Sequence, residues 1–387
     1  MGTLDNVSRA RLAGSRRLIV KIGSTLLVDE RTGQIRNDWL AGLGSDIAGM
    51  RSQGTSVVIV SSGAIAVGRS HLGLPSSNLA LEQKQAAAAT GQIRLAHAWQ
   101  EALVNYDITV AQILLTPSDT EERRRHLNAR ATIEMLLKLG AVPVINENDS
   151  VATEEIRYGD NDRLAARVAQ MISADTLILL SDVDGLYNAD PRTNVDAKLV
   201  PEVYDITPEI EKMAGVASSS YSSGGMVTKL QAAKISMAAG CAMAIIDGKP
   251  TDALARMRAG GRCTWFFPGS EPLPARKRWI AGSMTSSGTF IIDRGAVNAL
   301  RSGKSLLPAG VTGVRGTFER GDVVSVHVLG GHQIGCGLSA YSSEDANRIS
   351  GRKSREIEGI LGYRGRDEMI HRDDLVLDSN PSEVKAE

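Results

Sequence analysis

Two lysines stand beside glycine-rich turns, one near each end of the first 260 residues. Lys21 precedes Gly23-Ser24, and Lys229 closes a segment that begins at residue 223 and contains two adjacent glycines. Glycine lacks the Cβ that keeps a phosphate away from backbone N–H groups, and a helix that begins there adds its positive end. A lysine in the same turn adds a full positive charge. The 223–229 segment therefore predicts polyphosphate binding, although a plain loop with a solvated lysine remains an alternative.

A second kind of polar block lies in the middle of the chain and is rich in amides and carboxylates. It comprises Asn146-Glu147-Asn148-Asp149 and Gly159-Asp160-Asn161-Asp162. One such residue at a helix start is a common cap worth about 1 kcal/mol, but capping does not explain three in a row. Two carboxylates and an amide can bind an ammonium group, and one carboxylate can hold two lysines at a fixed separation. The two kinds of block together predict a site for an amino acid beside ATP.

Alternating aliphatic runs and helix-like stretches must position these blocks. The runs are expected to be strands at 18–22, 57–60, 108–115, 142–145, 176–180 and 242–246. Helices are predicted at 38–52, 79–104, 120–139, 161–172 and 225–239. This order predicts an α/β fold with a mainly parallel sheet sandwiched by helices. Because ligands bind beyond the carboxyl ends of parallel strands, the polar residues after each run are expected to converge at one edge, unless they are merely polar loops.

The composition changes after residue 265 and indicates a second domain. Prolines and basic residues at 266–285 are typical of a linker, which ends the first domain at 15–265. Short β-like runs broken by glycine then predict a small β-barrel-like domain or a compact α+β module at 286–370. Residues 371–387 are expected to form a C-terminal tail.

The overall composition excludes several classes of protein. Among 387 residues, 44 basic side chains balance 44 acidic ones, so no chain-wide field attracts nucleic acid or a membrane. No apolar run approaches the ~18–20 residues that a membrane span needs. Three cysteines without paired spacing argue against a disulfide framework or a zinc site. These features predict a cytoplasmic protein that has no membrane association.

The polar blocks, in their order along the chain, resemble the glutamate 5-kinases of the amino-acid kinase superfamily. The resemblance rests on Lys21–Ser24, Val60–Ile65, Val144–Asp149, Gly159–Asp162 and Gly224–Lys229, and it spans residues 17 to 375. The segment near 286–370 resembles the PUA domain of bacterial members. The sequence departs from the family pattern at Ser61, Ser223 and Val227, and none of these departures removes a reactive group.

The resemblance implies a role for each block. Lys21 and Lys229 would contact the transferring phosphoryl group, and Asp162 would hold both lysines in place. L-glutamate would be bound by Ser62, Asp149 and Asn161, with Asn146 and Asp160 close by. ATP would be held by Lys21, Gly23, Ser24, Ser181, Asp182, Ser223, Gly224, Gly225, Met226, Val227, Thr228 and Lys229. Mg²⁺ would travel with the nucleotide phosphates, and no protein ligand for it is predicted.

The chemistry of this reaction agrees with the residue types. A γ-carboxylate is already ionised at pH 7, so the nucleophile needs no general base. Phosphoryl transfer asks instead for alignment and charge neutralisation, which lysines, backbone N–H groups and Mg²⁺ provide. The resemblance further implies that γ-glutamyl phosphate is formed in the first step of proline biosynthesis. It also implies inhibition by proline, a functional partnership with glutamyl phosphate reductase, and a homodimer or homotetramer.

Two other functions remain open from the sequence. RNA binding through the C-terminal module would use the basic cluster Arg348, Arg352, Lys353 and Arg355, but this segment has little excess positive charge and a solvated helix face is favoured. A related kinase with another acceptor, such as acetylglutamate or a nucleoside monophosphate, is the second alternative.

Overall fold

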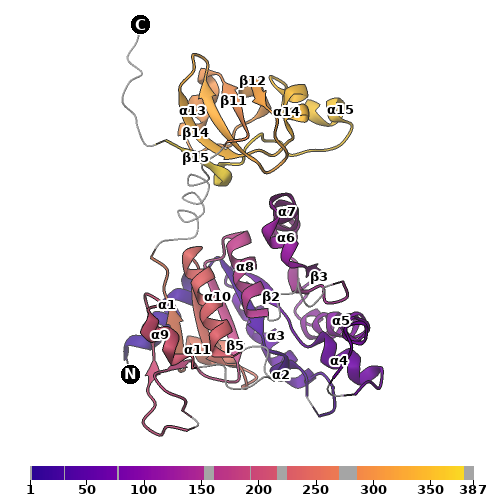
Figure 1. Cartoon of the computed structure of the whole chain (residues 1–387), viewed down its shortest axis with the longest axis vertical. Coiled ribbons are helices and arrows are strands. Elements are labelled where there is room, and N and C mark those ends of the chain that lie inside the picture. The colour runs from indigo at the N-terminus through magenta and orange to yellow at the C-terminus, as the bar shows by residue number, and fades with distance from the viewer. Residues whose placement is uncertain are drawn as a thin grey trace. The chain divides into compact units, whose positions relative to one another are not determined.

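The chain forms two compact units, Met1–Pro272 and Leu273–Glu387, each built on its own sheet (Figure 1). The computed structural model describes residues 2–29, 31–75, 78–151, 161–191, 193–215, 225–269 and 286–378. Three predicted site residues, Asp160, Ser223 and Gly224, lie outside this description. None of the helices in the described ranges is both long and apolar enough to cross a bilayer.

The first unit is organised around an eight-stranded sheet in the order β3-β4-β2-β1-β5-β9-β10-β8. Its strands are β1 (Arg17–Ile22), β2 (Ser56–Val60), β3 (Val110–Leu115), β4 (Val142–Glu147), β5 (Thr176–Ser181), β8 (Glu202–Val203), β9 (Ala242–Asp247) and β10 (Cys263–Phe266). All neighbours pair in parallel except β9 and β10. The predicted α/β fold with a mainly parallel sheet is therefore confirmed.

Helices connect these strands and cover both faces of the sheet. They are α1 (Gly2–Gly14), α2 (Ser24–Leu27), α3 (Asn37–Arg51), α4 (Ala64–His71), α5 (Leu81–Val104), α6 (Pro117–Glu121), α7 (Arg123–Lys138), α8 (Asn161–Ile172), α9 (Pro208–Met213), α10 (Met226–Ala238) and α11 (Ala253–Arg258). A small hairpin, β6 (Leu186–Tyr187) and β7 (Leu199–Val200), lies outside the main sheet.

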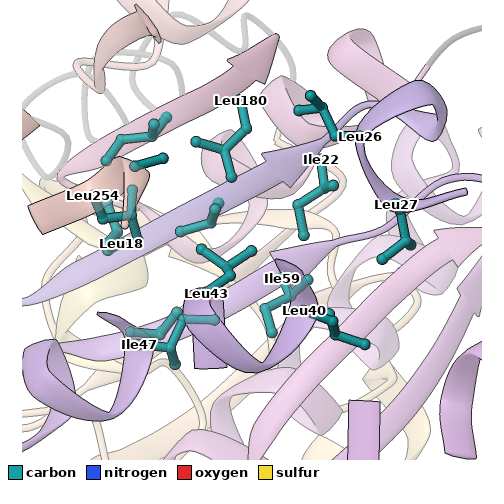
Figure 2. Packing of buried hydrophobic residues seen from close by; sticks show 14 of the residues in the cluster. Leu18, Ile22, Leu26, Leu27, Leu40, Leu43, Ile47, Ile59, Leu180 and Leu254 are labelled. Atoms are coloured by element: carbon teal, nitrogen blue, oxygen red, sulfur yellow. The ribbon is translucent and has the colours of Figure 1, made fainter. Parts of the chain in front are cut away.

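The alternation of side chains along β1 decides which face receives which residue. Leu18 and Ile22 pack into the core formed with α3, α5 and α11, which Figure 2 shows from close by. Ile19 packs into the other core, against α8 and α10. Because strand side chains alternate between the two faces, Lys21 lies on the same face as Ile19. The lysine of the first polar block is thereby directed toward α8 and α10.

The structure differs from the sequence-based expectations at several elements. The predicted helix at 120–139 is two helices, because a capping box between Thr116 and Asp119 starts α6 early and Glu122 is extended. Helices α1, α2, α4, α9 and α11 and strands β6, β7, β8 and β10 were not predicted. The first unit also continues into the predicted linker, because Phe266 is a fully buried residue of β10 and Phe267 is buried in the core of the same unit.

The second unit contains a mixed five-stranded sheet in the order β12-β11-β13-β14-β15. Its strands are β11 (Gly288–Ile292), β12 (Val311–Gly316), β13 (Val323–Val328), β14 (Gln333–Leu338) and β15 (Leu375–Leu377), and its helices are α13 (Arg294–Arg301), α14 (Ser343–Ile349) and α15 (Ile357–Leu361). Phe290 meets Phe318 edge to face in its core. Since β15 pairs with β14, residues 375–377 belong to the sheet rather than to the tail expected from residue 371.

The crossing of α4 and α5 depends on two glycines. A Cβ on Gly68 would lie 1.8 Å from the carbonyl oxygen of Ala87, and one on Gly91 would lie 1.8 Å from that of Ala64. These distances are far below van der Waals contact, so each glycine lets one helix backbone touch the other. Helix α4 begins directly after Ser61-Ser62-Gly63, so this crossing also sets the position of a polar block.

We expect Gly68→Ala and Gly91→Ala to destabilise the first unit by about 1–3 kcal/mol or more, because the added methyl group forces two backbones apart. Urea unfolding followed by circular dichroism measures the loss. The control is Gly49→Ala in α3, where a Cβ meets nothing within 4 Å; there the higher helix propensity of alanine should add up to about 1 kcal/mol. Equal stabilities for the three variants would contradict the backbone contact.

Candidate active site

The polar residues after the strands meet along one edge of the first sheet. In sheet order, Asn146 in β4, Ser61 after β2, Lys21 in β1, Ser181 in β5 and Asp247 in β9 are neighbours. The chain adds β2, β4 and β3 on one side of β1 and later β5 and β9 on the other. Where the direction in which strands are added reverses, α/β sheets have a crevice that binds ligands. Lys21, in β1, lies beside this point.

Asp162 joins the two lysines that the glycine-rich turns singled out. Its Oδ1 lies 2.5 Å from Lys21 Nζ, and its Oδ2 lies 3.0 Å from Lys229 Nζ. All three side chains are buried, Asp162 completely. Lys21 comes from β1, Asp162 from the first turn of α8 and Lys229 from the first turn of α10. The structure thus brings together two ammonium groups from distant parts of the sequence on one carboxylate.

Electrostatics keep this carboxylate charged. Burial alone would raise the pKa of Asp162, but the charges of Lys21 and Lys229, together with their hydrogen bonds, lower it below its ordinary value. One carboxylate cannot neutralise two ammonium groups, so the cluster keeps a net positive charge. A buried positive charge of this kind suits an anionic ligand.

The N-terminus of α10 offers room for such an anion. Gly225 precedes the helix with an extended backbone, and a Cβ there would meet no heavy atom of the described residues within 4 Å. Thr228 Oγ1 bonds to the Gly225 carbonyl oxygen at 2.8 Å and lies 3.4 Å from Asp162 Oδ2. Met226 and Val227 are half-buried in the same turn. The open backbone, the helix dipole and Lys229 together fit a phosphate group.

The remaining predicted nucleotide residues lie at or just beyond the ends of β1 and β5. Gly23 caps the short helix α2, and Ser24 is its exposed first residue. Ser181 Oγ bonds to Asp182 Oδ1 at 3.1 Å. Lys249, which sequence reasoning did not select for the site, donates to the Asp182 carbonyl oxygen at 2.7 Å and fixes the loop after β5. Its position directly after the β9 strand was the available signal.

On the other side of Lys21, Asn161 is the centre of an amide network. Its Nδ2 donates to Ser61 O at 2.8 Å, to Ser62 Oγ at 2.9 Å and to Asn146 Oδ1 at 2.8 Å. Asn146 is almost fully buried and donates to Gln92 Oε1 at 2.8 Å. The structure therefore brings Ser62, Asn146 and Asn161 together, next to Asp162.

Asp149 stays a predicted glutamate-site residue, whereas Gln92 was not selected from the sequence. Asp149 is half-buried in the turn after β4, where Asn148 N donates to Leu115 O at 2.8 Å. Gln92 was not predicted, because it lies in the middle of α5 and no motif surrounds it. Only the packing of α5 against the sheet reveals its contact with Asn146.

We expect Asp162→Asn to destabilise the protein by about 3 kcal/mol at pH 7, because two buried ammonium groups lose their counter-charge. The folded pKa of Asp162 lies below its unfolded value of about 3.9, so its contribution is full above pH 5. The stabilising contribution of Asp162 decreases as the pH falls below about 5, and it is lost once the pH falls below the folded pKa of Asp162. Urea unfolding should therefore show a constant gap between wild type and variant from pH 5 to 8, and a narrowing gap below about pH 4.

The control is Glu211→Gln, which removes the partner of Lys234 at the surface and should change stability by no more than about 0.5 kcal/mol. A gap for Asp162→Asn that is as small as this would refute the buried ion-pair cluster.

Comparison with known proteins agrees with this geometry. Residues 16–247 match the model of the amino acid kinase family, and residues 288–361 match that of the PUA domain. Glutamate 5-kinase from Paramagnetospirillum magneticum is 64% identical, with 95% of this chain and 99% of the relative covered. Glutamate 5-kinase from Rhodopseudomonas palustris (strain BisB5) is 59% identical over 97% of this chain and 100% of the relative. Glutamate 5-kinase 1 from Rhizobium meliloti is 58% identical over 96% and 94%, respectively. The chain therefore belongs to the glutamate 5-kinase family of amino acid kinases, and its C-terminal part is a PUA domain.

Proposed function

We propose that this protein transfers the γ-phosphoryl group of ATP to the γ-carboxylate of L-glutamate, giving ADP and γ-glutamyl phosphate. The observation that carries the proposal is the pair of lysines on Asp162, between an amide network and an open helix N-terminus. The names of the relatives support glutamate as the acceptor.

In the proposed reaction the ionised γ-carboxylate attacks the γ-phosphorus, and the bond to the β–γ bridging oxygen breaks. No proton leaves the nucleophile, so no general base is required. Lys21 and Lys229, which Asp162 holds at fixed positions, would neutralise the charge that develops on the phosphoryl oxygens. Because these charges are already in place, little reorganisation accompanies the reaction.

Glutamate and ATP would bind on opposite sides of Lys21. Glutamate would contact Ser62, Asn146 and Asn161, and we extend this site to Asp149 and Asp160. ATP would lie over Gly23, Ser24, Ser181, Asp182 and the segment 223–229. Mg²⁺ would enter on the nucleotide phosphates and neutralise their charge, and we assign no protein ligand to it.

The proposal includes a place in metabolism. The acyl phosphate would be consumed by glutamyl phosphate reductase in the first steps of proline biosynthesis, and proline would inhibit the kinase. We also expect a homodimer or homotetramer. RNA binding by the PUA domain stays only the alternative to a solvated helix face: Arg348 pairs with Asp345 at 3.7 Å and donates to the Ile360 carbonyl oxygen, which leaves it less available to a phosphate backbone.

A coupled ADP-release assay with an acceptor panel tests the activity. We expect ADP only when L-glutamate and Mg²⁺ are both present, and little with aspartate, N-acetylglutamate or UMP. Proline added to the glutamate reaction should slow it. Turnover with one of the other acceptors and none with glutamate would reject the proposed substrate.

We expect Lys229→Ala to lower kcat about 100-fold or more while the glutamate KM stays within about threefold, because the lost charge acts on the phosphoryl group. Steady-state kinetics with both substrates give the two parameters. Lys234→Ala on the exposed face of the same helix is the matched control and should keep wild-type kinetics. Unchanged turnover of Lys229→Ala would remove this lysine from the mechanism.

A further inference from the structure

Helix α5 places two side chains behind the amide network, although no motif marks either of them. Gln92 Oε1 accepts a hydrogen bond from Asn146 Nδ2, and Trp99 Nε1 donates to Ser61 Oγ at 3.2 Å. The two residues are seven positions apart and therefore lie on the same face of the helix. Gln92 is 7% exposed and Trp99 is fully buried. Both act behind the residues that face the candidate site.

The Asn146 amide is held at both ends, since its Oδ1 accepts from a backbone N–H and its Nδ2 donates to Gln92 Oε1. The Glu147 N–H can only donate, so Asn146 turns its Oδ1 toward it and its Nδ2 toward α5, where Gln92 Oε1 accepts at 2.8 Å. Asn146 Oδ1 accepts from Glu147 N at 2.9 Å and from Asn161 Nδ2 at 2.8 Å. A side-chain amide has donors at one end and an acceptor at the other, so one orientation dictates the next.

The hydrogen bonds of Asn161 likewise fix the orientation of its side-chain amide. Its Nδ2 is occupied by three acceptors, the oxygens of Ser61, Ser62 and Asn146. Its Oδ1 must therefore point away from them, and within the described residues it accepts no hydrogen bond. Ser62 Oγ accepts from Asn161, and its own proton has no acceptor among the residues that the structure describes. The network thus presents an acceptor at Asn161 and a donor at Ser62.

We propose that Gln92 is a positioning residue that holds the polarity of the amino-acid site by anchoring the Nδ2 end of Asn146, which in turn orients Asn161. The acceptor at Asn161 suits an α-ammonium group, and the donor at Ser62 suits a carboxylate. An acceptor with its nitrogen acylated offers only one N–H and no charge, so this polarity favours a free amino acid over its N-acyl derivative. The inference rests on the proposed function and deepens it.

The close crossing of α4 and α5 supports this role. Gly91, directly before Gln92, touches the backbone of Ala64, and Ala64 follows the Ser61-Ser62-Gly63 turn. The helix that carries Gln92 and the turn that carries Ser62 are therefore held at one fixed separation.

Steady-state kinetics of the full chain test the proposal with Gln92→Met, which keeps the side-chain length but removes the acceptor. We expect the glutamate KM to rise about tenfold or more, while the ATP KM and kcat stay within about threefold. Gln92→Glu keeps an oxygen in place and should hold the glutamate KM within about threefold of wild type. The matched control is Gln100→Met on the exposed face of α5, which should change none of these parameters.

A double-mutant cycle separates positioning from simple packing. If Gln92 acts through Asn146, adding Gln92→Met to Asn146→Ala should raise the glutamate KM no further. Additive effects, an equal rise in the ATP KM, or a glutamate KM raised tenfold in a folded Gln92→Glu variant would each overturn the proposal. The Glu variant still decides if the Met variant does not fold, as monitored by thermal unfolding.

The proposed activity and the role of Gln92 can be rejected separately. Wild-type protein without glutamate-dependent ADP release would reject the proposed function itself. Normal wild-type turnover with an unaltered glutamate KM in Gln92→Met would reject only the role of Gln92.

Discussion

A single buried carboxylate between two ammonium groups is the interaction on which this candidate site depends. Asp162 is fully buried, and its oxygens lie 2.5 and 3.0 Å from the nitrogens of Lys21 and Lys229. Taking three charges out of water is costly, and a hydrophobic cluster of the same volume would often be as stable. The charged cluster instead fixes the positions of two buried ammonium groups. Because Asp162 balances only one of their two positive charges, the cluster favours binding of a further anion.

The sheet order explains why the two kinds of polar residue lie on opposite sides of that cluster. Strand β1 ends at the crevice, with β2 and β4 on one side and β5 and β9 on the other. The first side carries the amides and the hydroxyl of Ser62, and the second carries the Ser181-Asp182 loop. The N-terminus of α10 adds its dipole at the cluster itself. In the proposed reaction the acceptor and the donor therefore approach the lysines from different directions, which is what an in-line transfer requires.

Much of this arrangement could be anticipated from local patterns. The strand that holds Lys21, the helix starts at Asn161 and Met226, and the glycines near them all follow from β-branched runs and helix-start residues. The ends of parallel strands must converge, so the meeting of these blocks followed from the alternation of strands and helices. Boundaries were less predictable where tertiary packing overrides propensity. Phe266 and β15 belong to sheets because they find partners there, and no local signal marks those partners.

The sequence by itself determined the inventory of reactive groups and the fold class, because periodicity and turn residues act over a few neighbours. Only the tertiary structure decided which partner each group meets. It placed both lysines on the same carboxylate, and it put Gln92, in mid-helix without any motif, behind Asn146. Such pairings depend on how closely two backbones approach, as at Gly68 and Gly91, and on which way an amide is turned. These are properties of packing among distant segments, and no window along the chain contains them.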